Sequence, residues 1–152
     1  MVILEDSRQK VGKHKTKHYV WSKSGDHVIR CKLPFGDYCL PPIVSVDTKA
    51  SLMEIASNMC GAPKEKARFR EECKAAHDSG CKLYFLIESN KSGIDDLMGM
   101  TIKMGSGKFV PGDQLAIAMH TMEERYGCVF IFTTKENSAN VIKEILRKGN
   151  DR

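Results

Sequence analysis

Two short motifs in the first third of the chain carry side chains that could do chemistry. One is Gly36-Asp37-Tyr38 and the other is Val46-Asp47-Thr48-Lys49, at the end of the apolar stretch that begins at Val44. Each aspartate lies at the rim of a strand-like stretch. Strand alternation places Asp47 and Lys49 on one side and Thr48 on the other. Two carboxylates and an ammonium group at one point would suit metal-assisted hydrolysis of a phosphodiester.

The residue types suit a hard divalent cation. Mg²⁺ prefers one or two protein carboxylates, with water and a substrate phosphate as further ligands. We expect Asp37 and Asp47 to be those carboxylates, and Thr48 to offer only its backbone carbonyl. Lys49 could orient the attacking water or stabilise charge on the transition state. Taken separately, Asp37 could simply be a turn residue, and Asp47 to Lys49 the exposed end of an edge strand.

A predicted helix adds a second acid and an arginine. Arg68 and Glu72 are four residues apart and therefore share a helix face. They could form a surface salt bridge of a few tenths of a kcal/mol. Alternatively, Glu72 reaches the metal or its water and Arg68 contacts a phosphate.

Strand and helix patterns alternate along the chain and predict one α/β domain, residues 1–152, with a mixed sheet flanked by helices. We expect a long loop over 7–24 with a short helical piece near Trp21, and a hairpin around Pro41-Pro42. Residues 89–110 carry no clear pattern. The helix over 63–79 should bury Ala62, Phe69, Cys73 and Ala76. The other predicted strands are 2–4, 27–33, 38–40, 43–46, 82–88 and 129–132, and the other predicted helices are 50–60, 111–126 and 137–148.

The charge is uneven along the chain. The net charge is +5, and the segment from Arg8 to Lys23 contains no acid, which is typical of a surface that binds a polyanion, or of a solvated loop. The sequence shows neither a signal peptide nor an apolar run of the roughly 18 residues that a membrane span needs. We therefore expect an intracellular protein without a membrane partner. Its six cysteines lie mostly in apolar stretches and look like small core residues.

The order of these motifs resembles the XPF-type structure-specific endonucleases of the PD-(D/E)XK nuclease superfamily. The resemblance covers nearly the whole chain. It rests on Asp6-x-Arg8 and Leu86-Ile87-Glu88 in addition to the motifs of Asp37, Asp47 and Glu72.

This resemblance implies a restriction-endonuclease-like core and a metal-dependent DNA endonuclease that acts on branched, flap or fork DNA in repair or recombination. Asp37 and Asp47 would bind Mg²⁺ or Mn²⁺, with Glu72 and the Thr48 carbonyl as further ligands, and Lys49 would be the catalytic lysine. It also implies a homodimer formed through the C-terminal helices, and a cytoplasmic or nucleoid-associated protein of a bacterial or phage-infected cell. The residues expected to support the site or bind DNA are Asp6, Arg8, Lys10, Lys13, Lys15, Lys17 and Arg68.

Several positions depart from the family pattern, and they leave alternatives open. Asp47 stands where the family has a glutamate, Thr48 where it has an arginine, and Met53 where it has an aspartate. Gln9 stands where an acid often follows the arginine that corresponds to Arg8. Glu54 lies beside Met53 but is rotated around the helix. We expect no helix-hairpin-helix module in this chain, although the family usually appends one. The alternatives are a non-catalytic DNA-binding or scaffolding subunit, and a junction-resolvase-type nuclease on the same core.

Overall fold

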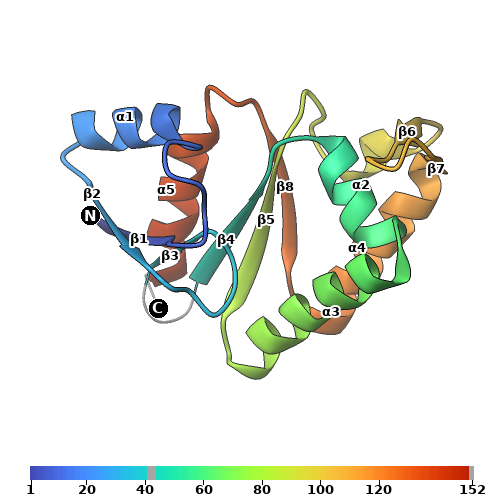
Figure 1. Cartoon of the computed structure of the whole chain (residues 1–152), viewed down its shortest axis with the longest axis horizontal. Helices are drawn as coiled ribbons and strands as arrows, with labels where there is room; N and C mark the ends of the chain where they lie inside the picture. The colour runs from blue at the N-terminus through green and yellow to red at the C-terminus, as the bar shows by residue number, and fades with distance from the viewer. Residues whose placement is uncertain (41–43, 151–152) are drawn as a thin grey trace.

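The predicted strands join into one six-stranded mixed sheet of order β2-β1-β3-β4-β5-β8. The computed structural model describes residues 1–40 and 44–150. The predicted α/β class, with helices against both faces of the sheet, is confirmed (Figure 1). The strands of this sheet are β1 (Val2–Asp6), β2 (His27–Cys31), β3 (Tyr38–Leu40), β4 (Val44–Lys49), β5 (Lys82–Glu88) and β8 (Val129–Thr133).

Strand direction brings the candidate residues to one edge. β4, β5 and β8 run parallel, and β1 runs parallel to β2. β3 is antiparallel to both of its neighbours, β1 and β4. The end of β1 at Asp6, the end of β4 at Lys49 and the start of β3 beside Asp37 therefore lie at the same edge of the sheet. The topology thus places motifs from distant parts of the sequence together.

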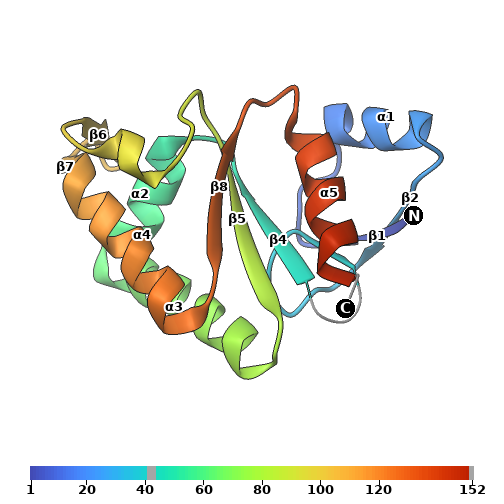
Figure 2. The same cartoon turned by 180° about the vertical axis from the view of Figure 1, so that it is seen from behind.

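Helices cover the two faces of the sheet unequally, as Figures 1 and 2 show from opposite sides. α1 (Lys15–Lys23) and α5 (Ser138–Asn150) lie against one face, where Trp21 and Ile142 are fully buried. α2 (Leu52–Cys60), α3 (Pro63–Asp78) and α4 (Gly112–Tyr126) cover the other face, around Phe85. Residues 94–111 add the short helix η1 (Ile94–Leu97) and the strand pair β6 (Thr101–Lys103) and β7 (Phe109–Pro111). None of the helices in the described ranges is long and apolar enough to cross a membrane.

Local sequence explains where α2 and α3 begin. Ser51 caps α2, because its side chain accepts a hydrogen bond from the Glu54 amide at 3.2 Å. Pro63 occupies the first turn of α3, where its missing N–H costs nothing. Both helices then bury one apolar face, which fixes their position over β4 and β5.

One expectation about local structure is wrong and another is confirmed only in part. The helical piece expected near Trp21 is present, but as α1 it occupies Lys15–Lys23, so less of the segment 7–24 is loop than expected. This helix is held by Trp21, whose Nε1 donates to the Ala139 carbonyl at 2.9 Å. Ala62 is exposed rather than part of the core, since it precedes the first turn of α3. The two arms of the predicted hairpin pair as β3 and β4, whereas its turn at 41–43 lies outside the described residues.

Candidate active site

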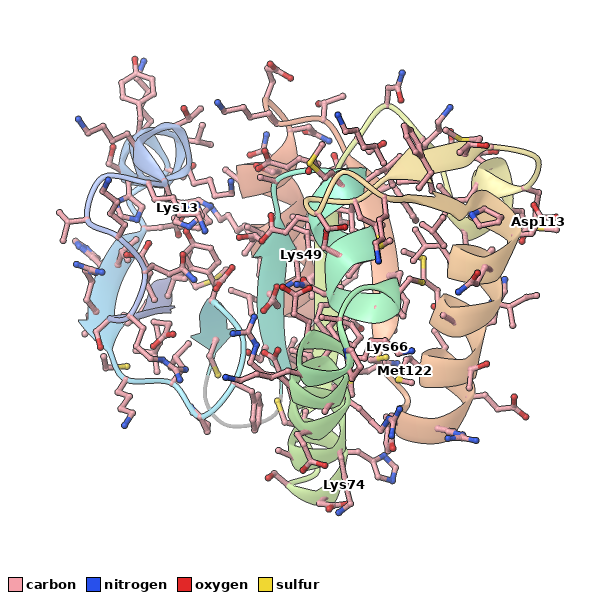
Figure 3. The ribbon with its side chains drawn as sticks, turned by 45° about the vertical axis from the view of Figure 1, so that its right-hand side comes forward. Lys13, Lys49, Lys66, Lys74, Asp113 and Met122 are labelled. Carbon is pink, nitrogen blue, oxygen red and sulfur yellow. The ribbon has the colours of Figure 1, made fainter. Side chains whose placement is uncertain are left out.

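Asp47 and Lys49 form a buried ion pair at the end of β4. Both residues are less than a tenth exposed, and the Lys49 Nζ lies 2.8 Å from Asp47 Oδ1. The Lys49 ammonium also sits 5.8 Å from the centre of the Phe85 ring, on the face covered by α2 and α3 (Figure 3). The predicted placement of Asp47 and Lys49 on one side of the strand is therefore found.

The electrostatics of this pair are set by burial and by two further acids. Burial raises the pKa of Asp47 well above its usual value; attraction to Lys49 opposes this shift, and repulsion by Asp37 and Glu72 adds to it. Burial alone would lower the pKa of Lys49, but Asp47 and Glu72 raise it. Lys49 is therefore a firmly charged cation among three acids, and Asp47 binds a proton more readily than an exposed aspartate does.

The turn at Gly36 places Asp37 beside the end of β4, at the same edge of the sheet as Asp47 and Lys49. Gly36 has a φ of +72°, and a Cβ at this position would lie 2.2 Å from the Ser45 hydroxyl. Only glycine fits both the conformation and the close approach to β4. The Asp37 amide then donates to the Val46 carbonyl at 2.8 Å, and the Asp37 carbonyl accepts from the Asp6 amide at 2.7 Å. Asp37 is thus anchored between β1 and β4 by its backbone.

Three hydrogen bonds hold the buried Asp37 carboxylate. Its Oδ2 accepts from the Thr48 backbone amide at 2.7 Å and from the Thr48 hydroxyl at 2.6 Å. Its Oδ1 accepts from the Gln9 side-chain amide. From the sequence we expected only the backbone carbonyl of Thr48 to take part, so this contact of its side chain with Asp37 was not predicted. The Thr48 side chain does lie on the α1 side of the sheet, where strand alternation puts it.

Glu72 reaches the turn from α3, while Arg68 stays in solvent. Glu72 Oε1 accepts from the Gly36 amide at 3.0 Å, so that the helix is tied to the turn that carries Asp37. Arg68, one helical turn earlier, is exposed beside it. Glu54 is engaged as a cap, because its Oε2 accepts from the Ala50 amide at 2.7 Å. Met53 is exposed.

Asp6 and Arg8 hold the loop that leads to the turn. Arg8 Nε lies 2.8 Å from Asp6 Oδ2, and Arg8 Nη2 donates to the Leu33 carbonyl at 2.7 Å. Asp6 Oδ1 accepts from the Leu33 amide at 3.2 Å. These contacts fix residues 31–36 against the end of β1. Asp6 and Arg8 therefore support the position of Asp37 through the loop that precedes it.

The basic segment is only partly a free surface. Lys10, Lys13 and Lys15 are exposed, but Lys17 is buried and lies 2.7 Å from Glu88. Lys17 is thus a correction to the expected DNA-binding set, because its charge is already paired inside the protein. Figure 3 shows Lys13 near α1, apart from Lys49 on the far side of β4. On the α1 side of the sheet, a pocket of about 130 Å³ is lined by Lys13, His14, Lys17, Thr48, Ala50, Glu88 and Lys135.

The acids fit a divalent cation by their chemistry. Within residues 1–40 and 44–150, no three His, Cys, Asp or Glu side chains enclose an ion position as they stand. Mg²⁺ commonly takes only one or two protein carboxylates, however. Asp47 Oδ1 is buried, its recorded polar partner in the described structure is the Lys49 ammonium at 2.8 Å, and three acids surround this one lysine. Three acids with a single cation to balance them leave excess negative charge, and their carboxylate oxygens are the ligands that a hard divalent cation takes.

Comparison with known proteins supports the fold. No protein-family model and no curated protein matches the sequence. The structure is similar to that of XPF from Aeropyrum pernix, with a TM-score of 0.72 and 18% identity over 100% of this chain and 66% of the other. It is also similar to XPF from Aeropyrum pernix in complex with DNA, with a TM-score of 0.70 and 18% identity over 97% of this chain and 64% of the other. The chain therefore has an XPF-type fold, and it spans just under two thirds of those chains.

Proposed function

We propose that this protein is a metal-dependent DNA endonuclease that hydrolyses phosphodiester bonds in branched, flap or fork DNA. The XPF-type fold supports this proposal, as does the fact that one similar structure is a complex with DNA. The observation that carries it is the buried Asp47–Lys49 pair, which shares one edge of the sheet with Asp37 and Glu72. Burying a cation and three acids together lowers the stability of the fold, because the charges lose their hydration. Such groups with shifted pKa values concentrate at catalytic sites.

Asp37 and Asp47 would hold Mg²⁺ or Mn²⁺, with the Thr48 backbone carbonyl and Glu72 as further ligands. When bound, such an ion would activate water and neutralise charge on the phosphate. The protein's own contribution is to hold the carboxylates in place before substrate arrives. Thr48 does this for Asp37 through two hydrogen bonds, and Glu72 ties α3 to the same turn through the Gly36 amide.

Lys49 is the proposed catalytic cation. Its ammonium is held by Asp47 at 2.8 Å, so its position is fixed without substrate. From there it can donate to a phosphate oxygen or orient a water, and its raised pKa keeps it charged at neutral pH. A charge fixed in a site shielded from water stabilises developing negative charge more strongly than one in solvent.

Lysine and arginine side chains on both sides of this edge would bind the DNA. Lys10, Lys13 and Lys15 are exposed on the α1 side, and Arg68 is exposed on α3. Contacts of this kind to phosphates bind without reading sequence and weaken as salt rises. Arg8 is half-exposed beside the same edge, with 55% of its side chain accessible.

A homodimer is part of the proposal. A surface groove of about 320 Å³ lies between the sheet and α5. It is lined by Tyr84, Ile131, Val141 and Ile145, together with Glu144 and Lys148. The equivalent groove of a second copy could pack against it, since the groove is lined by apolar side chains, Glu144 and Lys148 neutralise each other there, and a two-fold interface pairs a surface with itself. Sedimentation of the wild type and of Val141→Glu would test this: a dimer that Val141→Glu dissociates is expected, and a monomeric wild type would contradict it.

A non-catalytic DNA-binding subunit is the alternative. One observation favours it: within the described residues, no three potential metal ligands already lie close enough together to hold an ion. Fork, flap, four-way junction and linear duplex DNA, each incubated with Mg²⁺, Mn²⁺ or EDTA, separate the possibilities. We expect cleavage that needs metal and favours the forked or flapped DNA, and that Asp37→Asn abolishes. Tight binding without cleavage in any metal would support the alternative, and preferential cutting of the junction would indicate a resolvase.

A further inference from the structure

The Gln9 side chain links the Asp37 carboxylate to the basic segment. Its Nε2 donates to Asp37 Oδ1. Its Oε1 accepts from the Lys13 ammonium at 3.0 Å and lies 3.3 Å from His14 Nε2. One half-buried amide therefore contacts a proposed metal ligand at one end and two basic residues at the other.

The chemistry of these partners fixes which way the amide points. An ammonium group only donates hydrogen bonds, so Lys13 must face the amide oxygen. An ionised carboxylate only accepts them, so Asp37 must face the amide nitrogen. Reversing the amide would break both contacts at once. A glutamate at position 9 could not make both, because it has no donor for Asp37.

His14 completes the arrangement. It is buried, and its ring meets the Tyr38 ring edge-on, with centroids 5.5 Å apart. Burial and the nearby Lys17 and Lys13 charges lower the pKa of His14 to about 4, so the ring is neutral near pH 7. Its Nε2 can then carry the single ring proton and donate it to the Gln9 oxygen. Two donors thus hold the oxygen of Gln9, while Gln9 holds Asp37.

We infer that Gln9 is a positioning residue for Asp37, oriented for that task by Lys13 and His14. The inference rests on the proposed function, because it takes Asp37 to be a metal ligand. Thr48 occupies one carboxylate oxygen and Gln9 the other, so together they fix both the place and the rotation of the group. Oδ1 accepts one hydrogen bond, from Gln9, so its second lone pair can still bind a cation. A neutral amide adds a donor without adding a fourth negative charge to the site.

The test compares Gln9→Met, which keeps the length of the side chain and removes its polar ends, with Gln114→Met on the exposed surface of α4. Mn²⁺ binding without DNA is measured by calorimetry, cleavage by single-turnover kinetics, and folding by urea denaturation. We expect Gln9→Met to weaken Mn²⁺ binding roughly tenfold or more, as loss of a supporting contact to a metal ligand does. Gln114→Met should bind and cleave like the wild type.

A second variant checks the role of His14. His14→Phe should weaken Mn²⁺ binding less than Gln9→Met, and the double variant should bind no more weakly than Gln9→Met, because both changes act through one amide. Equal Mn²⁺ affinity of wild type, Gln9→Met and Gln114→Met would overturn this inference and leave the proposed function standing. A wild type that neither binds Mn²⁺ nor cuts DNA would overturn both.

Discussion

Thr48 donates two hydrogen bonds to a single oxygen of Asp37. Its backbone amide lies 2.7 Å and its hydroxyl 2.6 Å from Asp37 Oδ2, and both residues are buried. Because Thr48 directly follows Asp47 in β4, the position of one candidate metal ligand is set by the chain that carries the other. The two acidic motifs are therefore one structural unit rather than two neighbouring features.

Replacing Thr48 by valine should weaken this unit. Valine keeps the shape of threonine and removes the hydroxyl, so a buried carboxylate loses one donor. The free energy of unfolding, measured by urea denaturation, should fall by roughly 1–3 kcal/mol. Thr48→Ser retains the hydroxyl and should lose much less. Equal stability of Thr48→Val and the wild type would contradict the proposed anchoring of Asp37.

Lys17 should act on stability rather than on DNA binding. Lys17→Met leaves the Glu88 carboxylate, which is only 13% exposed, without its partner at 2.7 Å. Breaking a buried pair in this way costs roughly 3–5 kcal/mol. The double variant Lys17→Met/Glu88→Gln should recover part of this loss, because no unpaired charge remains. Lys15→Met, on the exposed face of the same helix, should be nearly as stable as the wild type and bind DNA more weakly.

Arg68 should contact DNA without contributing to the fold. Arg68→Ala is expected to raise the dissociation constant for forked DNA several-fold and to reduce its dependence on salt by about one counterion. Arg70→Ala is the matched control, since Arg70 is exposed on the same helix but points in another direction. If the two variants bound DNA equally, with equal dependence on salt, Arg68 would have no specific role.

His14 should make the protein less stable in mild acid. Burial, Lys17 and Lys13 lower the pKa of His14 to about 4 from 6.5. Between these values the unfolded chain binds a proton that the folded protein does not, so stability is lost as the pH falls from 6.5 to about 4 and then levels off.

The check is a comparison with His14→Gln, which cannot titrate. The difference in unfolding free energy between wild type and His14→Gln should shift against the wild type by roughly 2–3 kcal/mol over this range, at about 1.4 kcal/mol per pKa unit. A difference that does not change with pH would contradict a neutral, buried His14.

Much of the fold could be predicted from local patterns. The strand at Lys82–Glu88 is apolar over most of its length, and Pro63 marks the start of α3, so both elements follow from a few residues. A helical piece near Trp21 was expected, but the full helix over Lys15–Lys23 could not be predicted in this way. It forms a helix because Trp21 packs beneath α5 and bonds to Ala139, and this partner is far away in the sequence.

The site was predictable in its residue types but not in its connections. Alternation along β4 was enough to put Asp47 and Lys49 together. The bonds from Thr48 and Gln9 to Asp37 depend on how β1, β3 and β4 are ordered in the sheet, and no local pattern specifies this. Burial of Lys17 likewise depends on the position of Glu88 at the end of β5. A run of lysines gives charge, but the fold decides which of them face solvent.

The most direct test of the account is cleavage by Asp47→Asn. Single-turnover cutting of forked DNA is measured in Mn²⁺ for the wild type, for Asp47→Asn, and for Asp95→Asn, whose carboxylate is 93% exposed and far from this edge in sequence. We predict that Asp47→Asn loses at least a hundredfold in rate, on the order of what removal of one transition-state contact costs, while Asp95→Asn cuts like the wild type. Equal cutting by Asp47→Asn and the wild type would contradict an active site at Asp37, Asp47 and Lys49.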